Sequence, residues 1–585
     1  MTASATGRPA RSADSSVRAP AAAEDTAEGT AEGTAEGTAE GGDAWQALRR
    51  TPAHELFARS RRLLLDLRDD LDAARSAFDW PRPEHFNWAL EWFDVFARGN
   101  ERCALELPSR TGVRQVSYHR LSHRSDQVAN WLTDLGVSRG DRVFLVLGQQ
   151  LAWWETVLAC LKLGAVVIPG YPALTRSEAV DRVTRGGVRH VVCRSDATGL
   201  FEGVDLGIRV AVGEPVPGWQ EYANSGAAVA RFLPAAPTPA TDPAFGYFTS
   251  GTTAAPKLVL HTHASYPIGH LSSLYFNGLL PGDRHVNISA PGWAKHSWSS
   301  LFVPFTAGAT LVVPPDRDAE PAALPDVLLR RRVSSLCAPP SYWARLVPHL
   351  GTARPPLREA TTAGEPLPSG VAEAVRRSWR VPVREGYGQT ETTALIGTTP
   401  GMTGRPGWLG RPLPGWDVVV EDEEIRIRLE QRPTGLMAGY DGDEARTRSA
   451  FAGGRYRTGD IGESGPDGWF RILGRSDDVF KSGGHRVSPY ELEAVLRAHP
   501  SVSAAAVVPR PHPVLGSAAH AVVQLRPGCT TTAEELTGHV ADLVNDAVRV
   551  HSVEFTEALP RTASGKIRRA ALTPAAVPDA EEQTA

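Results

Sequence analysis

Between residue 117 and about residue 400 the sequence alternates between helical and strand-like segments. YHRLSHRSDQVANWLTDLG at 118–136 and AWWETVLACLKLG at 152–164 have apolar residues at helical spacing. DRVFLVLG at 141–148 and AVVIPGY at 165–171 are short apolar runs that follow them. Apolar strands of this kind, separated by helices, predict parallel sheet with helices on both faces.

The remaining third of the chain has two other patterns. From Gly404, short and more polar strands separated by Gly and Pro turns predict a small β-rich unit. Beyond Gly474 we expect a compact α+β unit, in which Ser488 caps a helix over SPYELEAVLRAHPSV. In this unit SAAAVVP and HAVVQLRPG are predicted strands, and AEELTGHVADLVNDAV is a predicted helix. The predicted fold class is therefore α/β, with a large N-terminal domain and a smaller α+β domain after it.

The two ends of the chain differ from the rest. Residues 26–41 repeat Thr-Ala-Glu-Gly four times, without an aromatic or branched aliphatic side chain. Such a segment cannot bury enough apolar surface to offset its ordering entropy, so we expect residues 1–44 to be a disordered acidic tail. A solvated extension is favoured over an acidic docking segment. We place a large domain at 45–475, a small one at 476–575 and a frayed tail at 576–585.

Composition excludes several classes of protein. The chain has 62 Lys and Arg against 66 Asp and Glu, a net charge of −4, so no bulk charge favours nucleic acid or anionic membranes. Its five cysteines include no Cys-x-x-Cys pair, which argues against a disulfide framework and a thiolate zinc site. No apolar run reaches the roughly 18 residues of a membrane helix, and no signal peptide is expected. We therefore expect a cytoplasmic protein without a membrane span.

The most informative segment is YFTSGTTAAPKLVLH, from Tyr247 to His261, in which an apolar strand leads into hydroxyls, glycine and lysine. Small hydroxyl residues on a tight loop present N–H and O–H donors to a polyphosphate, and Lys257 adds positive charge. The segment is not a G-x-x-x-x-G-K-[ST] loop, because Gly251 precedes Lys257 without a second glycine and Leu258 follows. It predicts a nucleotide-binding loop of another kind.

Five further segments accompany this loop in the order found in one enzyme family. They are GEPLP at 364–368, EGYGQTETT at 385–393, YRTGD at 456–460, GRSDDVFKSGGHRVSPYELE at 474–493 and LPRTASGKIRR at 559–569. Together they resemble the adenylate-forming superfamily of acyl-CoA synthetases, peptide-synthetase adenylation domains and luciferases. FNWALEWFD at 86–94 and APGWAKHSW at 290–298 are most similar to medium-chain and aryl acyl-CoA synthetases.

The resemblance implies a reaction in two halves. A carboxylate attacks the α-phosphate of ATP to give acyl-AMP and pyrophosphate, and a thiol, that of CoA, then displaces AMP. Because negative charge gathers around one phosphorus, the protein's task is positioning and charge stabilisation. The expected ligands are ATP, Mg²⁺, CoA and a small carboxylic acid.

The resemblance also assigns roles to residues. The phosphates are assigned to Ser250, Thr252, Thr253, Lys257 and Thr390, with Glu391 as the Mg²⁺ ligand. The adenosine is assigned to Gly364, Glu365, Pro366, Tyr387, Asp460 and Arg475. Lys566 is implied to bridge the carboxylate and the α-phosphate. For the mobile C-terminal domain the implied residues are the hinge Asp477, Arg486 in the adenylating pose, and Gly484 in the pantetheine tunnel.

The acyl pocket is expected around Trp293, His296, Ser297, Trp298 and Gly388. Two indoles favour a bulky apolar or aromatic acid, although tryptophans there are about as often core residues. Peptide-synthetase domains use an aspartate in this region for the substrate's amino group, and PGWAKHSW has none. If the acid carries a second polar group, Lys295 and His296 are the side chains expected to contact it.

One departure from the family pattern leaves alternatives open. The family's loop has a second glycine where this chain has Ala254. If that position needs positive φ or close approach to a phosphate, its Cβ costs about 1 kcal/mol or more. The alternatives are an enzyme that forms thioesters mainly from a preformed acyl-adenylate, one that loads a carrier-protein phosphopantetheine, and a non-catalytic nucleotide-binding protein.

Overall fold

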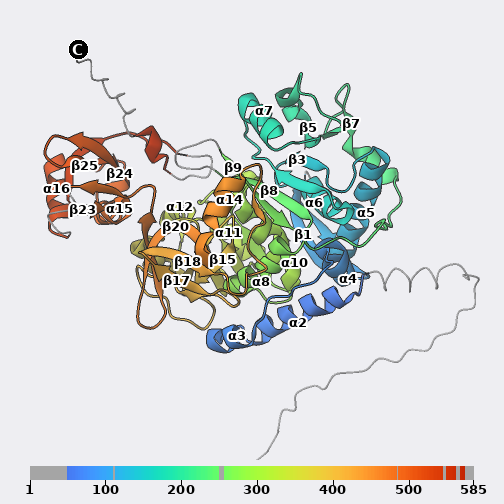
Figure 1. Cartoon of the computed structure of the whole chain (residues 1–585), viewed down its shortest axis with the longest axis horizontal. Helices are drawn as coiled ribbons and strands as arrows, with labels where there is room; N and C mark the ends of the chain where they lie inside the picture. The colour runs from blue at the N-terminus through green and yellow to red at the C-terminus, as the bar shows by residue number, and fades with distance from the viewer. Residues whose placement is uncertain are drawn as a thin grey trace, which may run out of the picture. The chain divides into compact units, whose positions relative to one another are not determined.

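The computed structural model describes residues 49–109, 112–249, 256–483, 485–543, 549–561 and 567–572. The predicted tails at 1–44 and 576–585 lie outside these ranges. Inside them the chain is a mixed α/β protein with a large N-terminal domain that contains parallel sheets and a smaller C-terminal domain, as the alternation of helix and strand predicted (Figure 1).

The first large sheet carries the start of the phosphate-loop segment. Its strand order is β19-β9-β8-β4-β3-β5-β6-β7 among the described residues. Its strands are β3 (Arg142–Val146), β4 (Val166–Pro169), β5 (His190–Arg194), β6 (Arg209–Val212), β7 (Gln220–Glu221), β8 (Pro243–Thr249), β9 (Lys257–Thr262) and β19 (Gly439–Tyr440).

The second large sheet carries the adenosine-associated motifs. Its order is β16-β15-β14-β13-β12-β10-β11-β1-β2 within the described ranges. Its strands are β1 (Cys103–Ser109), β2 (Gly112–Ser117), β10 (Arg284–Asn287), β11 (Thr310–Val312), β12 (Ser335–Cys337), β13 (Glu359–Ala363), β14 (Val383–Gln389), β15 (Thr393–Gly397) and β16 (Arg411–Pro412).

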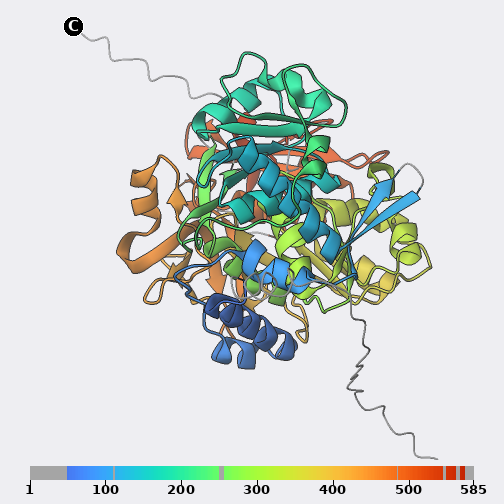
Figure 2. The ribbon, with the colours of Figure 1, turned by 90° about the vertical axis from the view of Figure 1, so that its right-hand side faces the viewer.

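Both sheets are parallel at the centre and antiparallel at edges, which the helix and strand alternation did not predict. In the first sheet β9 runs antiparallel to β8 and to β19. In the second, β15 runs antiparallel to β14, and the β1–β2 hairpin forms one edge (Figure 2, light blue arrows). The connections from β8 to β9 and from β14 to β15 are too short for a parallel crossover, so they fold back as hairpins. Both hairpins carry predicted nucleotide residues.

Smaller sheets form the rest of the strand content. The predicted β-rich unit is a sheet of order β17-β18-β20-β21, and the C-terminal domain has β22 paired with β23 and a sheet of order β24-β25-β26. These strands are β17 (Val418–Glu421), β18 (Glu424–Arg428), β20 (Arg455–Ser464), β21 (Phe470–Arg475), β22 (Phe480–Ser482), β23 (His485–Val487), β24 (Val502–His512), β25 (Gly516–Leu525) and β26 (Val550–Phe555).

The helices follow the sequence patterns closely. Ser117 caps α5 by accepting from the amide of Arg120, and Gly164, with φ of 81°, ends α6 in the left-handed region. The α-helices are α2 (Pro52–Asp66), α3 (Leu71–Ala77), α4 (Asp94–Ala97), α5 (Tyr118–Asp134), α6 (Leu151–Leu163), α7 (Arg176–Arg185), α8 (Ser265–Asn277), α9 (Ala294–Ser297), α10 (Val303–Ala307), α11 (Leu324–Arg330), α12 (Pro340–Leu346), α13 (Ser369–Trp379), α14 (Glu444–Ala450), α15 (Pro489–Ala498) and α16 (Ala533–Ala541).

Two wider helical turns interrupt this regular pattern. They are the π-helices η1 (Trp88–Phe93) and η4 (Trp298–Phe302). The 3₁₀ turns are η2 (Ser195–Phe201), η3 (Tyr222–Ala227), η5 (Asp316–Asp318), η6 (Val347–His349), η7 (Ala452–Gly454) and η9 (Arg569–Ala571). Because a π-turn changes the face that following residues present, the segments after Phe86 and Trp293 do not follow a simple 3.6-residue period.

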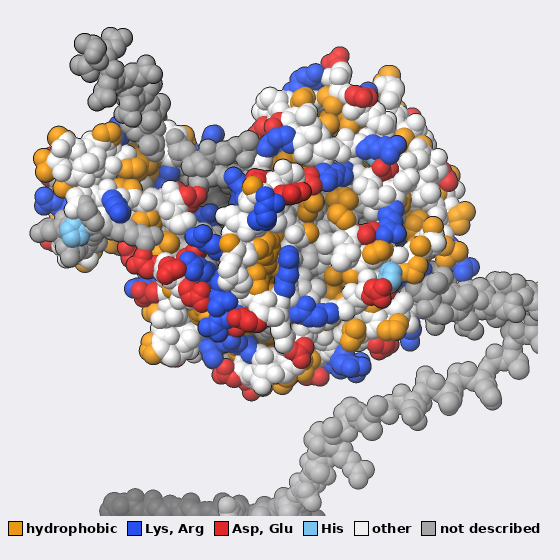
Figure 3. All heavy atoms as spheres, in the orientation of Figure 1, with side chains coloured by type: hydrophobic (Ala, Val, Ile, Leu, Met, Phe, Trp, Pro, Cys, Tyr) orange, Lys and Arg blue, Asp and Glu red, His pale blue; other side chains and the backbone are white. Residues whose placement is uncertain are grey.

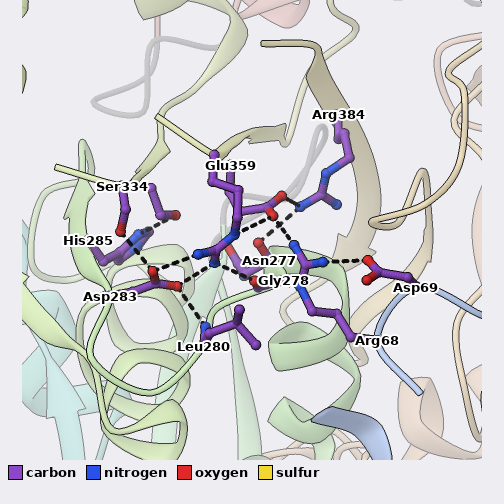
Figure 4. A network of polar contacts seen from close by, with 12 residues as sticks. Arg68, Asp69, Asn277, Gly278, Leu280, Asp283, His285, Ser334, Glu359 and Arg384 are labelled. Atoms are coloured by element: carbon purple, nitrogen blue, oxygen red, sulfur yellow. Dashed lines mark hydrogen bonds and ion pairs between the residues drawn. The ribbon is translucent and has the colours of Figure 1, made fainter. Parts of the chain in front are cut away.

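A buried ion network holds the beginnings of β13 and β14 (Figure 4). Glu359, the first residue of β13, accepts hydrogen bonds from Arg68, from Arg358 Nε at 3.1 Å and from Arg384 Nη2 at 2.6 Å. Arg384 also donates to the carbonyls of Asn277 and Thr398 at 3.0 and 2.9 Å. The network fixes the ends of the two strands opposite to those that carry Gly364 and Tyr387.

On the face drawn in Figure 3, Lys and Arg side chains lie among Asp and Glu side chains. Among the described residues, no helix is long and apolar enough to cross a bilayer.

Candidate active site

The adenosine-associated residues meet around the carboxylate of Asp460, which is 6% exposed. Its Oδ2 accepts hydrogen bonds from the Tyr387 hydroxyl and from Gln389 Nε2 at 2.6 Å, and its Oδ1 accepts from Arg475 Nη1 at 3.1 Å. Burial opposes the charge of Arg475, yet the Asp460 carboxylate raises its pKa above the ordinary value. Burial, followed by the charge of Asp460, raises the pKa of Tyr387 well above its usual range. The Tyr387 phenol therefore stays neutral where it donates to Asp460.

The turn between β14 and β15 carries the residues assigned to the α-phosphate and to magnesium. Its Glu391 Oε1 lies 3.5 Å from Lys257 Nζ and accepts a hydrogen bond of 3.0 Å from the Tyr440 hydroxyl. Lys257 Nζ also donates to Tyr440 at 3.3 Å and lies 4.6 Å from the centre of its ring. The structure thus brings together Lys257 and Glu391, which are predicted phosphate and metal residues from distant motifs.

His261 contacts the backbone of the same turn. Its Nε2 lies 2.7 Å from the carbonyl oxygen of Thr390, and its Nδ1 lies 2.9 Å from Ser265 Oγ. The imidazole is fully buried, and burial lowers its pKa to about 4. A neutral ring therefore supports the backbone of the residue assigned to the α-phosphate.

Gly364, Glu365 and Pro366 follow directly after β13, at the end of the strand beside β14. Gly364 has φ of 105°, a conformation that side chains strain to adopt. Lys295 Nζ donates to the carbonyl oxygen of Ala363, the residue before Gly364, at 3.3 Å. The expected adenine wall and the expected acyl segment therefore meet at this strand end.

The expected acyl residues point in different directions. Trp293 is half-buried and stacks on Tyr171, with ring centres 6.2 Å apart and planes at 24°. His296 is fully buried against Trp153 and Trp154, with ring centres at 4.5 and 6.1 Å. Burial lowers the pKa of His296 to about 3, so the ring is neutral. Of the two polar side chains Lys295 and His296, only Lys295 has a described contact with the adenosine-associated strand end.

The remaining expected acyl residues are Ser297, Trp298 and Gly388. The Ser297 hydroxyl is buried, and Trp298 is half-buried against the apolar core. Gly388 is exposed, but a Cβ there would lie 1.8 Å from the carbonyl oxygen of Thr393. The hairpin itself therefore requires glycine at position 388, whatever the acid.

Several predicted residues lie outside the described part of the chain. They are Ser250, Thr252, Thr253, Ala254, Gly484 and Lys566, together with the side chain of Arg486. Of the hinge, Asp477 is described, and its Oδ1 lies 3.2 Å from Arg475 Nε. Arg475 therefore contacts both the expected ribose ligand and the expected hinge.

Four site residues have no assigned role in the sequence analysis: His261, Tyr440, Gln389 and Tyr456. Tyr440 lies on the two-residue strand β19, where it pairs with Val259 of β9. The hydroxyl of Tyr456 donates to Gln389 Oε1 at 3.0 Å, which orients the Gln389 amide toward Asp460. Gln389 and Tyr456 lie inside motifs that the sequence displays, whereas no motif surrounds Tyr440.

The chain is similar in sequence and in structure to known enzymes. Residues 94–437 match the model of the AMP-binding enzyme family, and residues 491–566 match that of the AMP-binding enzyme C-terminal domain. A 4-hydroxybutyrate–CoA ligase of Metallosphaera sedula is 34% identical over 509 residues, which cover 83% of this chain and 90% of that protein. A mitochondrial acyl-coenzyme A synthetase of Mus musculus is 32% identical over 522 residues, covering 83% and 90%. The crystal structure of an anthranilate CoA ligase with anthranoyl-AMP superposes with a TM-score of 0.75 at 26% identity, covering 84% and 97%.

Proposed function

The chain belongs to the AMP-binding enzyme family, as an ATP-dependent, AMP-forming carboxylic acid–CoA ligase, and from this premise we propose how its residues divide the reaction. Asp460, Tyr387, Gln389 and Arg475 bind the adenosine, and the turn that carries Thr390 and Glu391 serves the phosphates. The observation that supports this most directly is the Asp460 carboxylate, which is buried and oriented by three donors at the edge of the site.

In the first half-reaction an oxygen of the substrate carboxylate attacks the α-phosphorus, and the bond to pyrophosphate breaks. Lys257 supplies positive charge to the leaving pyrophosphate, the hydroxyls of the 250–253 segment donate hydrogen bonds to it, and Thr390 donates to the α-phosphate. Lys566 neutralises the two anions as they approach. In the second half-reaction the CoA sulfur attacks the carbonyl carbon, and AMP leaves. Gly484 lines the path of the thiol, Arg486 serves the adenylating pose, and Asp477 is the hinge between the two poses.

Glu391 fits a magnesium ion as a single protein ligand. It is a nearly buried carboxylate next to the predicted phosphate site, and among the described residues no group of three or more His, Cys, Asp or Glu side chains could form a complete cage. Mg²⁺ is commonly held by one or two carboxylates together with substrate phosphates and water. When bound, the ion would neutralise phosphate charge, with Glu391 as its protein ligand.

We propose a bulky apolar or aromatic acid as the substrate. Trp293 and Tyr171 offer a stacked aromatic pair, and Gly292 packs so closely on Gly170 that a Cβ would lie 2.7 Å from its carbonyl carbon. The anthranilate CoA ligase that this chain resembles acts on an aromatic acid, and the 4-hydroxybutyrate–CoA ligase on a short polar one. The aromatic pair favours the former class.

A screen tests this proposal. The unmodified protein is incubated with ATP, Mg²⁺, CoA and a panel of aliphatic, hydroxylated, aryl and terpenoid acids, and AMP and acyl-CoA are measured. We expect the highest kcat/KM with aryl or bulky apolar acids. A preference for short hydroxylated acids would refute the substrate proposal, and thioester formation on a carrier protein but never on CoA would refute the choice of acceptor.

Ala254 supports a second candidate, an enzyme that works mainly from a preformed acyl-adenylate. The test is the rate of pyrophosphate release with ATP and acid, for the unmodified protein and for Ala254→Gly. A strain of about 1 kcal/mol corresponds to a roughly fivefold gain in the glycine variant. Robust release by the unmodified protein rejects this candidate, whereas weak release that rises about fivefold in Ala254→Gly supports it.

A further inference from the structure

Strand β9 presents two side chains to consecutive residues of the β14–β15 turn. Lys257 and His261 lie four residues apart on this strand, and side chains an even number of residues apart lie on the same face. Lys257 meets Glu391 at 3.5 Å, and His261 meets the carbonyl oxygen of Thr390 at 2.7 Å. The turn is therefore attached to β9 at both of the residues that serve the reaction.

The partners of His261 determine which nitrogen carries the proton. The Thr390 carbonyl can only accept, so Nε2 carries the hydrogen and donates. Ser265 Oγ accepts from the amide of Thr262 at 2.8 Å, so its own hydrogen is available to donate to Nδ1 at 2.9 Å. Both ring nitrogens are thus satisfied in one neutral tautomer.

The surroundings of His261 favour a fixed and uncharged ring. It is fully buried, and the Tyr266 ring packs against it with centres 4.5 Å apart. Burial lowers its pKa to about 4, so the ring stays neutral at physiological pH. Its contribution near neutrality is therefore the hydrogen bond that it donates to the Thr390 carbonyl.

We propose that His261 is a positioning residue for adenylation, which sets the Thr390–Glu391 turn through its Nε2–H bond to the Thr390 carbonyl. This inference rests on the proposed function, because that function assigns Thr390 to the α-phosphate and Glu391 to the magnesium ion. The bond fixes the peptide between Thr390 and Glu391, and with it the directions in which both side chains leave the turn. A small misplacement of such groups slows a reaction that depends on alignment.

The test compares three variants of His261. His261→Gln keeps an amide N–H that can reach Thr390, whereas the shorter amide of His261→Asn reaches only the Ser265 side. His261→Phe keeps the ring volume without a donor. We expect His261→Asn and His261→Phe to slow pyrophosphate release with ATP and acid roughly 100-fold, with thioester formation from supplied acyl-AMP within about threefold of the unmodified protein. We expect His261→Gln to recover most of the rate.

The matched control is His285→Phe. His285 is also fully buried and bonded at both nitrogens, to Ser335 and Ser299 at 2.9 and 3.0 Å, but it lies on β10 and not at the turn. We expect it to lower the melting temperature without a selective loss of pyrophosphate release. If His261→Phe does not fold, the contrast between Gln and Asn carries the test.

The outcomes distinguish failure of the positioning role from failure of the proposed function. If the unmodified protein releases no pyrophosphate with any acid, the proposed function fails. If it does, and His261→Asn keeps the full rate, or both half-reactions fall equally, or His261→Gln is as slow as His261→Asn, then the positioning role is refuted while the proposed function stands.

Discussion

Asp460 and Arg475 lie directly opposite each other on β20 and β21, and Arg475 Nη1 donates to Asp460 Oδ1 at 3.1 Å. The register of the small sheet therefore sets the distance between them. Because Oδ2 is held by Tyr387 and Gln389, the carboxylate is oriented before any nucleotide arrives. An oriented acceptor loses less entropy when it binds a hydroxyl.

Asp460→Asn should weaken nucleotide binding in both half-reactions. In this variant the side-chain amide nitrogen would take the place of Oδ1, where it would face the donor Arg475, or of Oδ2, where it would face the donors Tyr387 and Gln389. The substitution would also remove the negative charge. Hydrogen bonds to charged groups contribute about 1.5–3 kcal/mol, which corresponds to a roughly 10- to 100-fold rise in KM for ATP and for acyl-AMP. Steady-state kinetics of each half-reaction measure this. Asp467→Asn, which loses only an exposed pair with Arg405, is the control, and an unchanged KM for ATP in Asp460→Asn would contradict the role.

Lys566→Ala should separate the two half-reactions. Carboxylate-dependent pyrophosphate release is expected to disappear, because the two anions then approach without a neutralising cation. Thioester formation from supplied acyl-AMP should remain largely intact, since that step no longer needs the lysine. Arg568→Ala is the control, an exposed cation two residues away. Equal loss of both activities in Lys566→Ala would show that the lysine acts on the fold or on both steps.

Glu359→Gln should lower stability strongly. The Glu359 side chain is nearly buried and pairs with Arg68, Arg358 and Arg384. Arg68 and Arg358 also pair with Asp69 and Asp283, so Glu359→Gln leaves chiefly the buried Arg384 without its acidic partner. Removal of one partner from a buried ion network typically costs about 3–5 kcal/mol, because the remaining charges stay buried. Urea unfolding measures the loss. The control Glu373→Gln removes the solvent-exposed partner of Arg376 and should change the unfolding midpoint very little. A midpoint for Glu359→Gln as high as that of the control would contradict the stabilising role.

Stability should fall as pH decreases from about 6.5 towards 4. Burial lowers the pKa of His261, His263 and His285 to about 4 and that of His296 to about 3. Below the ordinary histidine pKa of 6.5 the unfolded chain binds protons at these residues, whereas the buried rings of the folded chain stay unprotonated. Acid therefore favours unfolding. Each ring contributes about 1.4 kcal/mol per pH unit inside this window.

Urea unfolding at pH 7.5, 6.5 and 5.5 measures this dependence. Stability should fall slightly between pH 7.5 and 6.5 and about three times as much between pH 6.5 and 5.5. His285→Gln removes one of the rings and should give a shallower dependence. Equal stability at pH 7.5 and 5.5 would refute the contribution of the buried imidazoles.

The elements with clear local signals could be predicted from the sequence. The helix after Ser488 is α15, and the Ser488 hydroxyl accepts from the amide of Glu491 as expected of a cap. The alternation of helix and strand around residues 118–171 gives α5, β3, α6 and β4 in order. These signals are local, because caps and periodicity depend on residues within a few positions of each other.

Contacts between distant segments could not be predicted in this way. Tyr440 meets Lys257 across 183 positions and lies on a strand of two residues, which is too short to show a period. The direction of His296 also has no local signal, because it lies on the four-residue helix α9, two residues before the π-helix η4 begins. The ring faces α6 because Trp153 and Trp154 are there to pack against it.

The attachment of the β14–β15 turn to β9 also limits how the phosphate-loop segment can vary in length. Thr249 and Lys257 are paired in the β8–β9 register, and a slip of β9 by one residue would turn Lys257 and His261 to the opposite face. An insertion or deletion between residues 250 and 256 must therefore be absorbed within that segment. A change of register would remove the Lys257 cation and the His261 donor from the turn at once.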